Sequence, residues 1–218
     1  MAINKETTSI SFSDLAAFLA DSVKDSPTMQ IPAPELVNYY KDLANRVLWI
    51  NDSIDQDTMS IVKRIMEFNL ADKDIPVEER KPIKILLDTT GGSVSVMWSI
   101  IKAIKMSKTP VYTINFCDCL SAGAHILASG HKRFAMPGST VLIHSGSCMY
   151  TGTQEQADNA KKYYDALCKK ADTQLLADTK IDLKVFKKKS PFDWYLDADE
   201  ALQYGIVDKI IEDFTEID

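Results

Sequence analysis

A serine at the end of an apolar strand is the first residue of this chain whose setting suggests chemistry. Ser121 opens a helical segment, and the small residues 122–124 come directly after it. Small neighbours let a substrate carbonyl reach a hydroxyl, as a nucleophilic serine requires. The G-x-S-x-G pattern of nucleophile elbows is half matched, because Cys119 stands at its first glycine position. A serine here is most often only a helix N-cap, so both interpretations stay open at this point.

A pair of glycines marks a second strand-to-helix junction. Gly91 and Gly92 lie in the run D-T-T-G-G-S-V at 88–94, directly after an apolar strand. Adjacent glycines let the backbone come close to a ligand and direct N–H groups toward it. The G-x-G-x-x-G fingerprint of dinucleotide binding is absent. An ordinary tight turn is the alternative interpretation.

A nucleophilic serine needs a base, and the chain has three histidines. His125 lies on the same helical segment as Ser121 between apolar neighbours, so we expect a structural role. His131 follows a turn glycine and precedes two basic residues, which predicts an exposed side chain. His144 ends an apolar strand and would direct its ring into the site region. His144 is therefore the candidate base, with a satisfied strand-end histidine as the alternative.

Many carboxylates could orient such a base. Asp193 stands out because aromatic residues surround it in the run S-P-F-D-W-Y-L. An unpaired carboxylate is costly in apolar surroundings, so we expect Asp193 to have a partner.

The elements that must position these residues alternate between strands and helices, which predicts an α/β fold with a parallel sheet. Strands are expected at 47–50, 83–87, 111–116, 133–136, 140–144 and 206–211. Helices are expected at 36–45, around 61–66, 94–104, from Ser121, at 154–177 and at 198–204. The helix at 154–177 is polar with a thin apolar stripe, which predicts that it projects or packs on a partner. Residues 1–35, with a short helix around 15–23, read as an N-terminal appendage.

Composition limits the function classes. The chain has 218 residues and a formal net charge of −6, which argues against nucleic-acid binding. The basic run 187–189 reads as a solvated loop. The four cysteines form no C-x-x-C pair, so we expect reduced thiols and no metal site or cofactor. No apolar stretch reaches membrane-spanning length and the first residues lack a signal-peptide core, which predicts a cytoplasmic protein without membrane contact.

Several ordered motifs resemble one known family. Residues 39–211 resemble the proteolytic subunit of the Clp protease, ClpP, and the landmarks are spread along that span. They are L-D-T-T-G-G-S at 87–93, S-A-G-A at 121–124, K-R-F-A-M-P at 132–137, L-I-H at 142–144, E-A at 200–201 and Y-G-I-V-D at 204–208.

The resemblance implies a crotonase-like α/β fold with a peptidase domain over 36–218 and a protruding handle at about 150–190. It implies a serine endopeptidase that acts on peptides or unfolded proteins inside a heptameric or tetradecameric ring. Carried over by position, Ser121 is the nucleophile, His144 the general base and Asp193 its orienting acid. The N–H groups of Gly92 and Ala122 would form the oxyanion hole.

The chain also departs from the family pattern. Cys117 and Thr90 replace a glycine and a proline, and Ser145 with Gly146 replaces Gln-Pro after the base. The family binds an AAA+ unfoldase in pockets that include aromatic residues of the strand before the Gly-Gly turn.

By register those positions are Lys84 and Leu86, so we expect weak or absent stimulation by a standard Clp unfoldase. The protein would then use a dedicated partner, or it would act on unfolded chains without an unfoldase.

Three alternatives remain at this point. An acyl-CoA hydratase or isomerase of the same fold would also polarise a carbonyl with two N–H groups, but it leaves Ser121, His144 and Asp193 unexplained. A non-catalytic ring subunit would normally have lost one of these three residues. A phage-type capsid-maturation protease on the same fold is the third.

Overall fold

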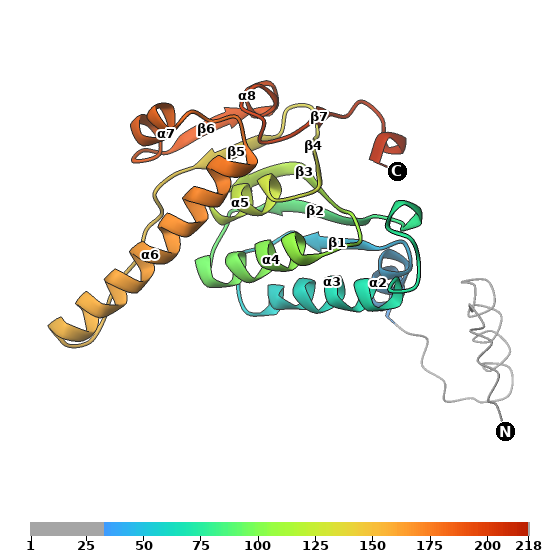
Figure 1. Ribbon diagram of the computed structural model, residues 1–218, viewed down its shortest axis with the longest axis horizontal. Coiled ribbons are helices and arrows are strands. Elements are labelled where there is room, and N and C mark those ends of the chain that lie inside the picture. The colour runs from blue at the N-terminus through green and yellow to red at the C-terminus, as the bar shows by residue number, and fades with distance from the viewer. Residues whose placement is uncertain (1–32, 218) are drawn as a thin grey trace, which may run out of the picture. The chain divides into compact units, whose positions relative to one another are not determined.

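The structure is a computed structural model that describes residues 33–217 (Figure 1). Contacts divide the chain into two units, 1–45 and 46–218. The described part of the first unit is helix α2 (Pro34–Ala44), which confirms the helix expected there. The short helix expected around 15–23 lies outside the described residues. The domain boundary at residue 35 stays a prediction.

The second unit alternates strands and helices along its length. Its strands are β1 (Val47–Ile50), β2 (Ile83–Thr89), β3 (Val111–Leu120), β4 (Lys132–Ala135), β5 (Thr140–Ile143), β6 (Trp194–Asp197) and β7 (Lys209–Ile210). Its α-helices are α3 (Ser60–Ala71), α4 (Val94–Met106), α5 (Ala122–Ala128), α6 (Gln154–Asp178), α7 (Leu183–Lys189) and α8 (Ala198–Gln203). Among the described residues, no helix combines the length and the apolar character needed to cross a membrane.

The strands form one sheet in the order β1-β2-β3-β4-β7, and these neighbours are parallel. Strand β3 is long enough to have two partners on one side. Its first half pairs with β4, and residues 118–120 pair with 140–142 of β5. The edge of the sheet therefore changes partners next to Ser121.

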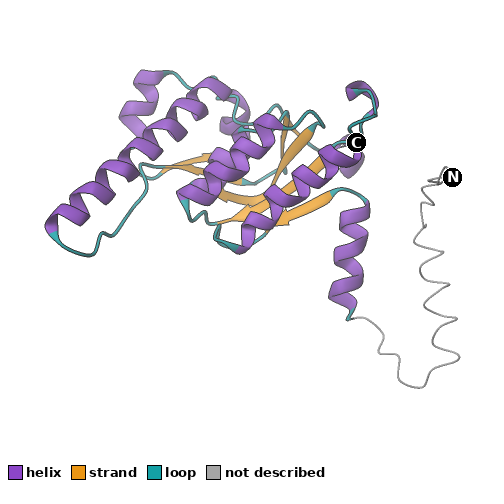
Figure 2. Cartoon of the chain, turned by 60° about the horizontal axis from the view of Figure 1, so that its bottom comes forward, coloured by secondary structure: helices purple, strands orange, loops and turns teal. Residues whose placement is uncertain are grey.

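Helices pack against one face of this sheet (Figure 2). On β2 the inward side chains of Ile83, Ile85 and Leu87 are fully buried, whereas Lys84 and Leu86 on the other face are partly exposed. The apolar stripe of α4 is buried and its lysines are exposed, as expected from its helical spacing. Every residue of α5 is buried, so the helix that begins at the candidate nucleophile is part of the core.

Two elements near the C-terminus differ from the prediction. Strand β6 is absent from the predicted elements; it pairs antiparallel with β5, so the sheet is not wholly parallel. Its alternating burial, with Trp194 and Leu196 inside, is the signal that would have found it. The run 187–189 is not a loop but the last turn of α7, where lysines interact favourably with the helix dipole.

A buried ion pair joins the start of β1 to the end of α3. Asp72 is 1% exposed and accepts hydrogen bonds from Arg46 Nη1 and Nη2 at 2.6 and 2.5 Å and from Thr109 Oγ1 at 2.9 Å. These bonds, led by the one from Arg46, hold the pKa of Asp72 below its ordinary value of 3.8.

We predict that Asp72→Asn lowers the free energy of unfolding by about 3 kcal/mol, because it leaves Arg46 partly buried without its counter-charge. A group whose pKa is lower in the folded state stabilises the fold above its unfolded pKa. The stability difference between wild type and variant should therefore shrink as the pH falls below 3.8. Urea unfolding over pH measures both effects. Asp74→Asn, at an exposed neighbouring carboxylate, is the control; an equal loss there would contradict the prediction.

Candidate active site

Ser121 occupies a sharp turn between β3 and α5. Its backbone has φ 54° and ψ −116°, a conformation that non-glycine residues rarely adopt. Its N–H donates to the Leu142 carbonyl at 2.9 Å, which ties the turn to β5. The side chain makes no capping hydrogen bond to α5, so the N-cap interpretation is wrong. The turn instead presents the hydroxyl at the surface of a cavity, as a nucleophile elbow does.

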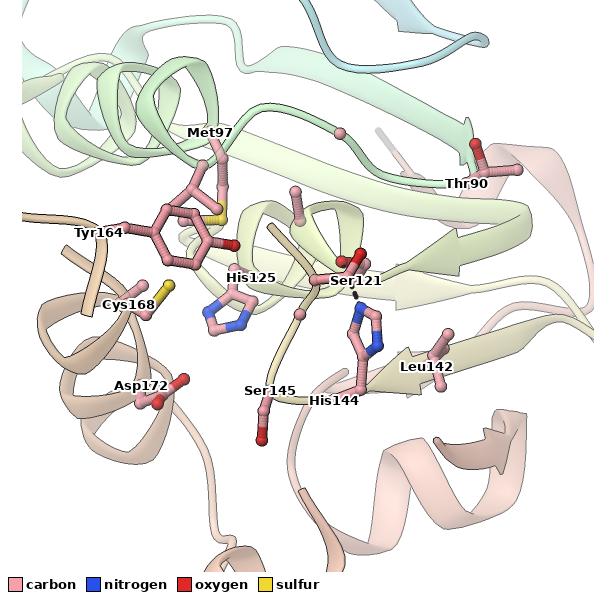
Figure 3. Close-up of a pocket in the computed structure, with 16 residues that line it drawn as sticks. Thr90, Met97, Ser121, His125, Leu142, His144, Ser145, Tyr164, Cys168 and Asp172 are labelled. Atoms are coloured by element: carbon pink, nitrogen blue, oxygen red, sulfur yellow. Dashed lines mark hydrogen bonds between the residues drawn. The ribbon is translucent and has the colours of Figure 1, made fainter. Parts of the chain in front are cut away.

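The Ser121 hydroxyl meets His144. The distance from Ser121 Oγ to His144 Nε2 is 2.8 Å (Figure 3). On the other side of the ring, His144 Nδ1 lies 3.2 Å from Asp193 Oδ1. Because a carboxylate oxygen accepts, Nδ1 carries the proton and Nε2 is left to accept from the serine. This arrangement is able to take a proton from a serine that attacks a carbonyl.

The antiparallel pairing of β5 with β6 explains how these two residues meet. Ile143 lies opposite Trp194 in the ladder, so His144 and Asp193 come next, one at the end of each strand. Asp193 has the partner that its surroundings suggested. Its side chain is 60% exposed, however, and is not embedded among the aromatic residues, because Trp194 points inward and Phe192 outward.

The Gly-Gly turn packs directly behind the serine. Gly91 has φ +93°, and a Cβ built on it would lie 2.6 Å from the Leu120 carbonyl and 2.8 Å from Ser121 Cβ. Gly92 has φ +150°, and a Cβ there would lie 2.3 Å from the Ile54 carbonyl. Both positions therefore require glycine. The N–H of Gly92 has no partner among the described residues, and Ala122, as the first residue of α5, has no acceptor within its helix.

The other two histidines have the predicted burial, but one of them also lines the cavity. His131 is exposed, and its Nδ1 accepts a hydrogen bond from the Val111 N–H at 2.8 Å. His125 is buried, and burial lowers its pKa to about 4, so its ring is neutral at physiological pH. It does not bond to Ser121 but lines the same cavity. The sequence alone suggests a purely structural role for it.

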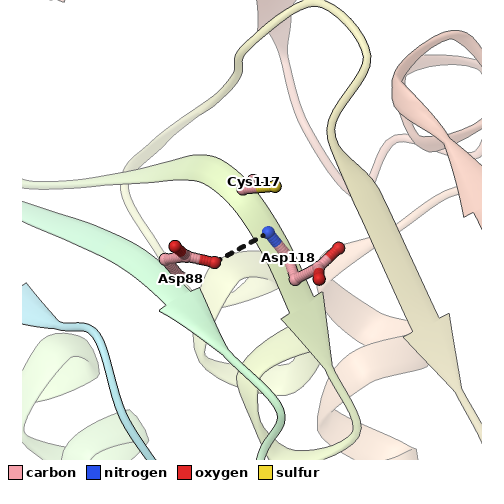
Figure 4. Close-up of side chains that lie close together, drawn as sticks. All are labelled: Asp88, Cys117 and Asp118. Atoms are coloured by element: carbon pink, nitrogen blue, oxygen red, sulfur yellow. Dashed lines mark hydrogen bonds between the residues drawn. The ribbon is translucent and has the colours of Figure 1, made fainter.

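A second cluster of polar side chains lies at the ends of β2 and β3. Asp88, Cys117 and Asp118 offer ligand atoms within 4.8 Å of one another, and Asp88 Oδ1 accepts from the Asp118 N–H at 3.2 Å (Figure 4). The charge of Asp118, with burial and Asp88, raises the pKa of the Cys117 thiol. A raised pKa disfavours the thiolate, which is the nucleophilic form of cysteine. All four cysteines are free.

The cavity beside Ser121 has a volume of about 340 Å³ and reaches α6. Tyr164, Cys168 and Asp172 line it from that helix, at intervals of four residues. The sequence assigns none of these three to the site: Tyr164 reads as part of the thin apolar stripe of the helix, and Cys168 and Asp172 read as part of its polar face. The i, i+4, i+8 spacing is the available signal.

Comparison with known proteins gives one consistent result. The Clp protease family model matches residues 33–214. The chain is 28% identical over 180 residues to the ATP-dependent Clp protease proteolytic subunit 2 of Treponema pallidum (strain Nichols), an alignment that covers 82% of this chain and 88% of that protein. These matches confirm the family resemblance and the crotonase-like fold.

The geometry predicts that His144→Ala slows peptide hydrolysis on the order of 10⁶-fold, because the residues of a triad act as a unit and the base is lost. His125→Ala and His131→Ala should cost much less, since neither ring contacts the Ser121 hydroxyl. Steady-state rates, with circular dichroism to check folding, make the comparison. If folded His125→Ala is as impaired as His144→Ala, the base has been assigned wrongly.

Proposed function

Because the chain belongs to the Clp protease family, we propose that Ser121, His144 and Asp193 form its catalytic triad and hydrolyse peptide bonds of unfolded proteins or peptides. The protein is a serine-type endopeptidase of the ClpP kind. The observation that carries the residue assignment is the continuous contact from Ser121 through His144 to Asp193. The order Ser, His, Asp along the chain differs from that of the three common triads.

In the proposed reaction, His144 Nε2 takes the proton from Ser121 Oγ as the oxygen attacks the scissile carbonyl. The same nitrogen then gives the proton to the leaving amine, and an acyl group stays on Ser121. Water, activated by His144, releases that acyl group. Asp193 keeps the proton on Nδ1 and stabilises the imidazolium that forms in between.

We assign the oxyanion hole to the N–H groups of Gly92 and Ala122. Both residues line the cavity with Ser121, and neither N–H needs an acceptor elsewhere in the described fold. The carbonyl oxygen becomes negative as Ser121 attacks, and one such donor typically contributes about 3 kcal/mol to transition-state stabilisation. The Gly91 and Gly92 backbone lies so close to its neighbours that only glycine fits, and this close approach brings the Gly92 N–H beside the nucleophile.

Ser121→Ala should abolish peptide hydrolysis, with a loss on the order of 10⁶-fold. The substitution removes one oxygen and little volume, so thermal unfolding should stay unchanged. The control is Ser95→Ala, at an exposed position of α4. Activity that survives in a clean Ser121→Ala preparation would refute the assignment.

Helix α6 supports assembly into a ring. It has 25 residues, and only Leu167, Ala171 and Leu175 are buried, all in its second half. At 1.5 Å per residue it is roughly 37 Å long, and in Figure 1 its first half extends away from the sheet. Tyr163 on that half is 66% exposed, and Met149 in the preceding loop is 89% exposed. We propose that this handle helix contacts other copies of the chain.

We therefore expect a ring oligomer, and the family resemblance implies seven or fourteen copies. Light scattering coupled to size-exclusion chromatography measures the mass. Tyr163→Asp should shift the distribution toward smaller species, whereas Lys162→Asp, a charge change at an exposed neighbour without an apolar side chain, should shift it less. Active protein that is monomeric at working concentration would contradict the proposed ring.

The positions expected to receive an unfoldase lie on the sheet face away from the helices. Lys84 pairs with Tyr112 and Leu86 with Ile114 in the β2–β3 register. Leu86 packs against a buried apolar cluster that Ile217, near the C-terminus, helps to form together with Tyr112, Ile114, Phe134 and Ile211. The Lys132 ammonium lies 4.9 Å from the centre of the Tyr112 ring. An apolar loop would have to displace Ile217 and desolvate lysines, which supports weak docking.

We predict little or no stimulation by a standard Clp unfoldase, measured as ATP-dependent degradation of an unfolded tagged substrate. Deleting residues 214–218 should increase any binding, because it uncovers the cluster around Tyr112 and Ile114. Tight binding of a standard unfoldase to the wild type, unaffected by Lys84→Glu, would show that these residues do not control docking.

A further inference from the structure

The cavity beside the nucleophile contains a carboxylate that has no partner among the described residues. Asp172 lines this cavity together with Ser121, and none of the lining residues is lysine or arginine (Figure 3). Two other carboxylates of α6 are paired: Asp165 with Lys161 at 2.6 Å and Asp178 with Lys105 at 2.8 Å. Asp172 forms no hydrogen bond or ion pair within the described part of the chain. Its burial raises its pKa to about 6, the sign of a charge that lacks compensation.

A neutral histidine lines the same cavity. Burial lowers the pKa of His125, so its ring carries no charge that could pair with Asp172. Its Nδ1 has almost no accessible surface and no partner among the described residues, so it offers nothing to a ligand in the cavity. The charge of Asp172 is therefore left for a ligand to compensate.

The walls of the cavity suit an aliphatic chain. Met97, Val94 and Leu142 line it, and the unpaired carboxylate of Asp172 lines it from α6. A lysine or arginine side chain buries its methylene stem against apolar groups and ends in N–H donors. An apolar side chain of the same length would cover the carboxylate and leave it unpaired, which is costly.

We propose that Asp172 makes this cavity a P1 pocket selective for lysine or arginine, so that the peptidase cleaves after basic residues. This inference rests on the proposed function, because P1 is the residue whose carbonyl Ser121 attacks. Asp172 is a specificity-determining residue and takes no part in the chemical step.

The test compares two peptide substrates that differ only at P1, lysine against norleucine, which has nearly the same shape and no amine. With the full-length assembled protein at pH 7.5, kcat/KM should favour lysine by about tenfold or more. Asp172→Asn should bring the ratio close to one while the norleucine peptide is cleaved at least as fast as by wild type. Asp158→Asn, at an exposed position of the same helix, should leave the ratio unchanged.

The pH dependence of this ratio gives a second readout that needs no variant. The other titratable groups that line the cavity are His125 on α5, Tyr164 and Cys168 on α6, and His144 after β5. Above pH 5 His125 is neutral, and the pKa values of Tyr164 and Cys168 are raised, so both stay uncharged near pH 6. His144 affects both substrates alike and cancels in the ratio. The preference for lysine should therefore fall as the pH drops through about 6, where Asp172 becomes protonated.

A fluorophosphonate probe without a P1 side chain separates this proposal from the function on which it rests. If the probe labels Ser121 but the wild type prefers norleucine, or Asp172→Asn keeps the preference for lysine, the P1 proposal is wrong and the peptidase assignment stands. If the probe does not label Ser121, both are overturned.

Discussion

The strained backbone of Ser121 is the feature on which the site depends. A non-glycine residue at φ 54° and ψ −116° costs of the order of 1–3 kcal/mol and persists only where its surroundings hold it. Here the Leu142 carbonyl holds the N–H, Gly91 packs against the side chain, and the wholly buried helix α5 anchors the residues after the turn. The strain turns the hydroxyl out of the sheet and leaves the next N–H, that of Ala122, free of a helical acceptor.

The sheet topology around the site brings the other two residues to Ser121. Strand β3 continues past β4 and pairs with β5 at residues 118–120, which places the end of β5 beside the serine. Strand β6 then pairs antiparallel with β5 and returns the chain to the same edge. His144 and Asp193 thus reach Ser121 from two adjacent strand ends. Three residues far apart in the sequence are aligned by the two ladders that β5 forms, one with β3 and one with β6.

The sequence predicts the parts of this site that depend on local chemistry. Ser121 and the glycines at 91 and 92 are visible as small residues at strand-to-helix junctions, although a helix N-cap and a tight turn produce the same pattern until the family resemblance is added. His144 is visible as a polar residue that ends an apolar strand. Asp193 needs the family resemblance, and the reasoning from its neighbours places it in apolar surroundings that the structure does not have. Asp172 and the cavity role of His125 depend on how α6 packs against α5, a tertiary contact that no local pattern contains.

We propose that one turn presents both the nucleophile and half of the oxyanion hole. A crystal structure of the enzyme inactivated by a fluorophosphonate would check this geometry, because the phosphonyl oxygen imitates the oxyanion. We expect a covalent bond to Ser121 Oγ, with that oxygen roughly 2.7–3.1 Å from the amide nitrogens of Gly92 and Ala122. An adduct on another residue, or an oxygen that points away from both amides, would contradict it.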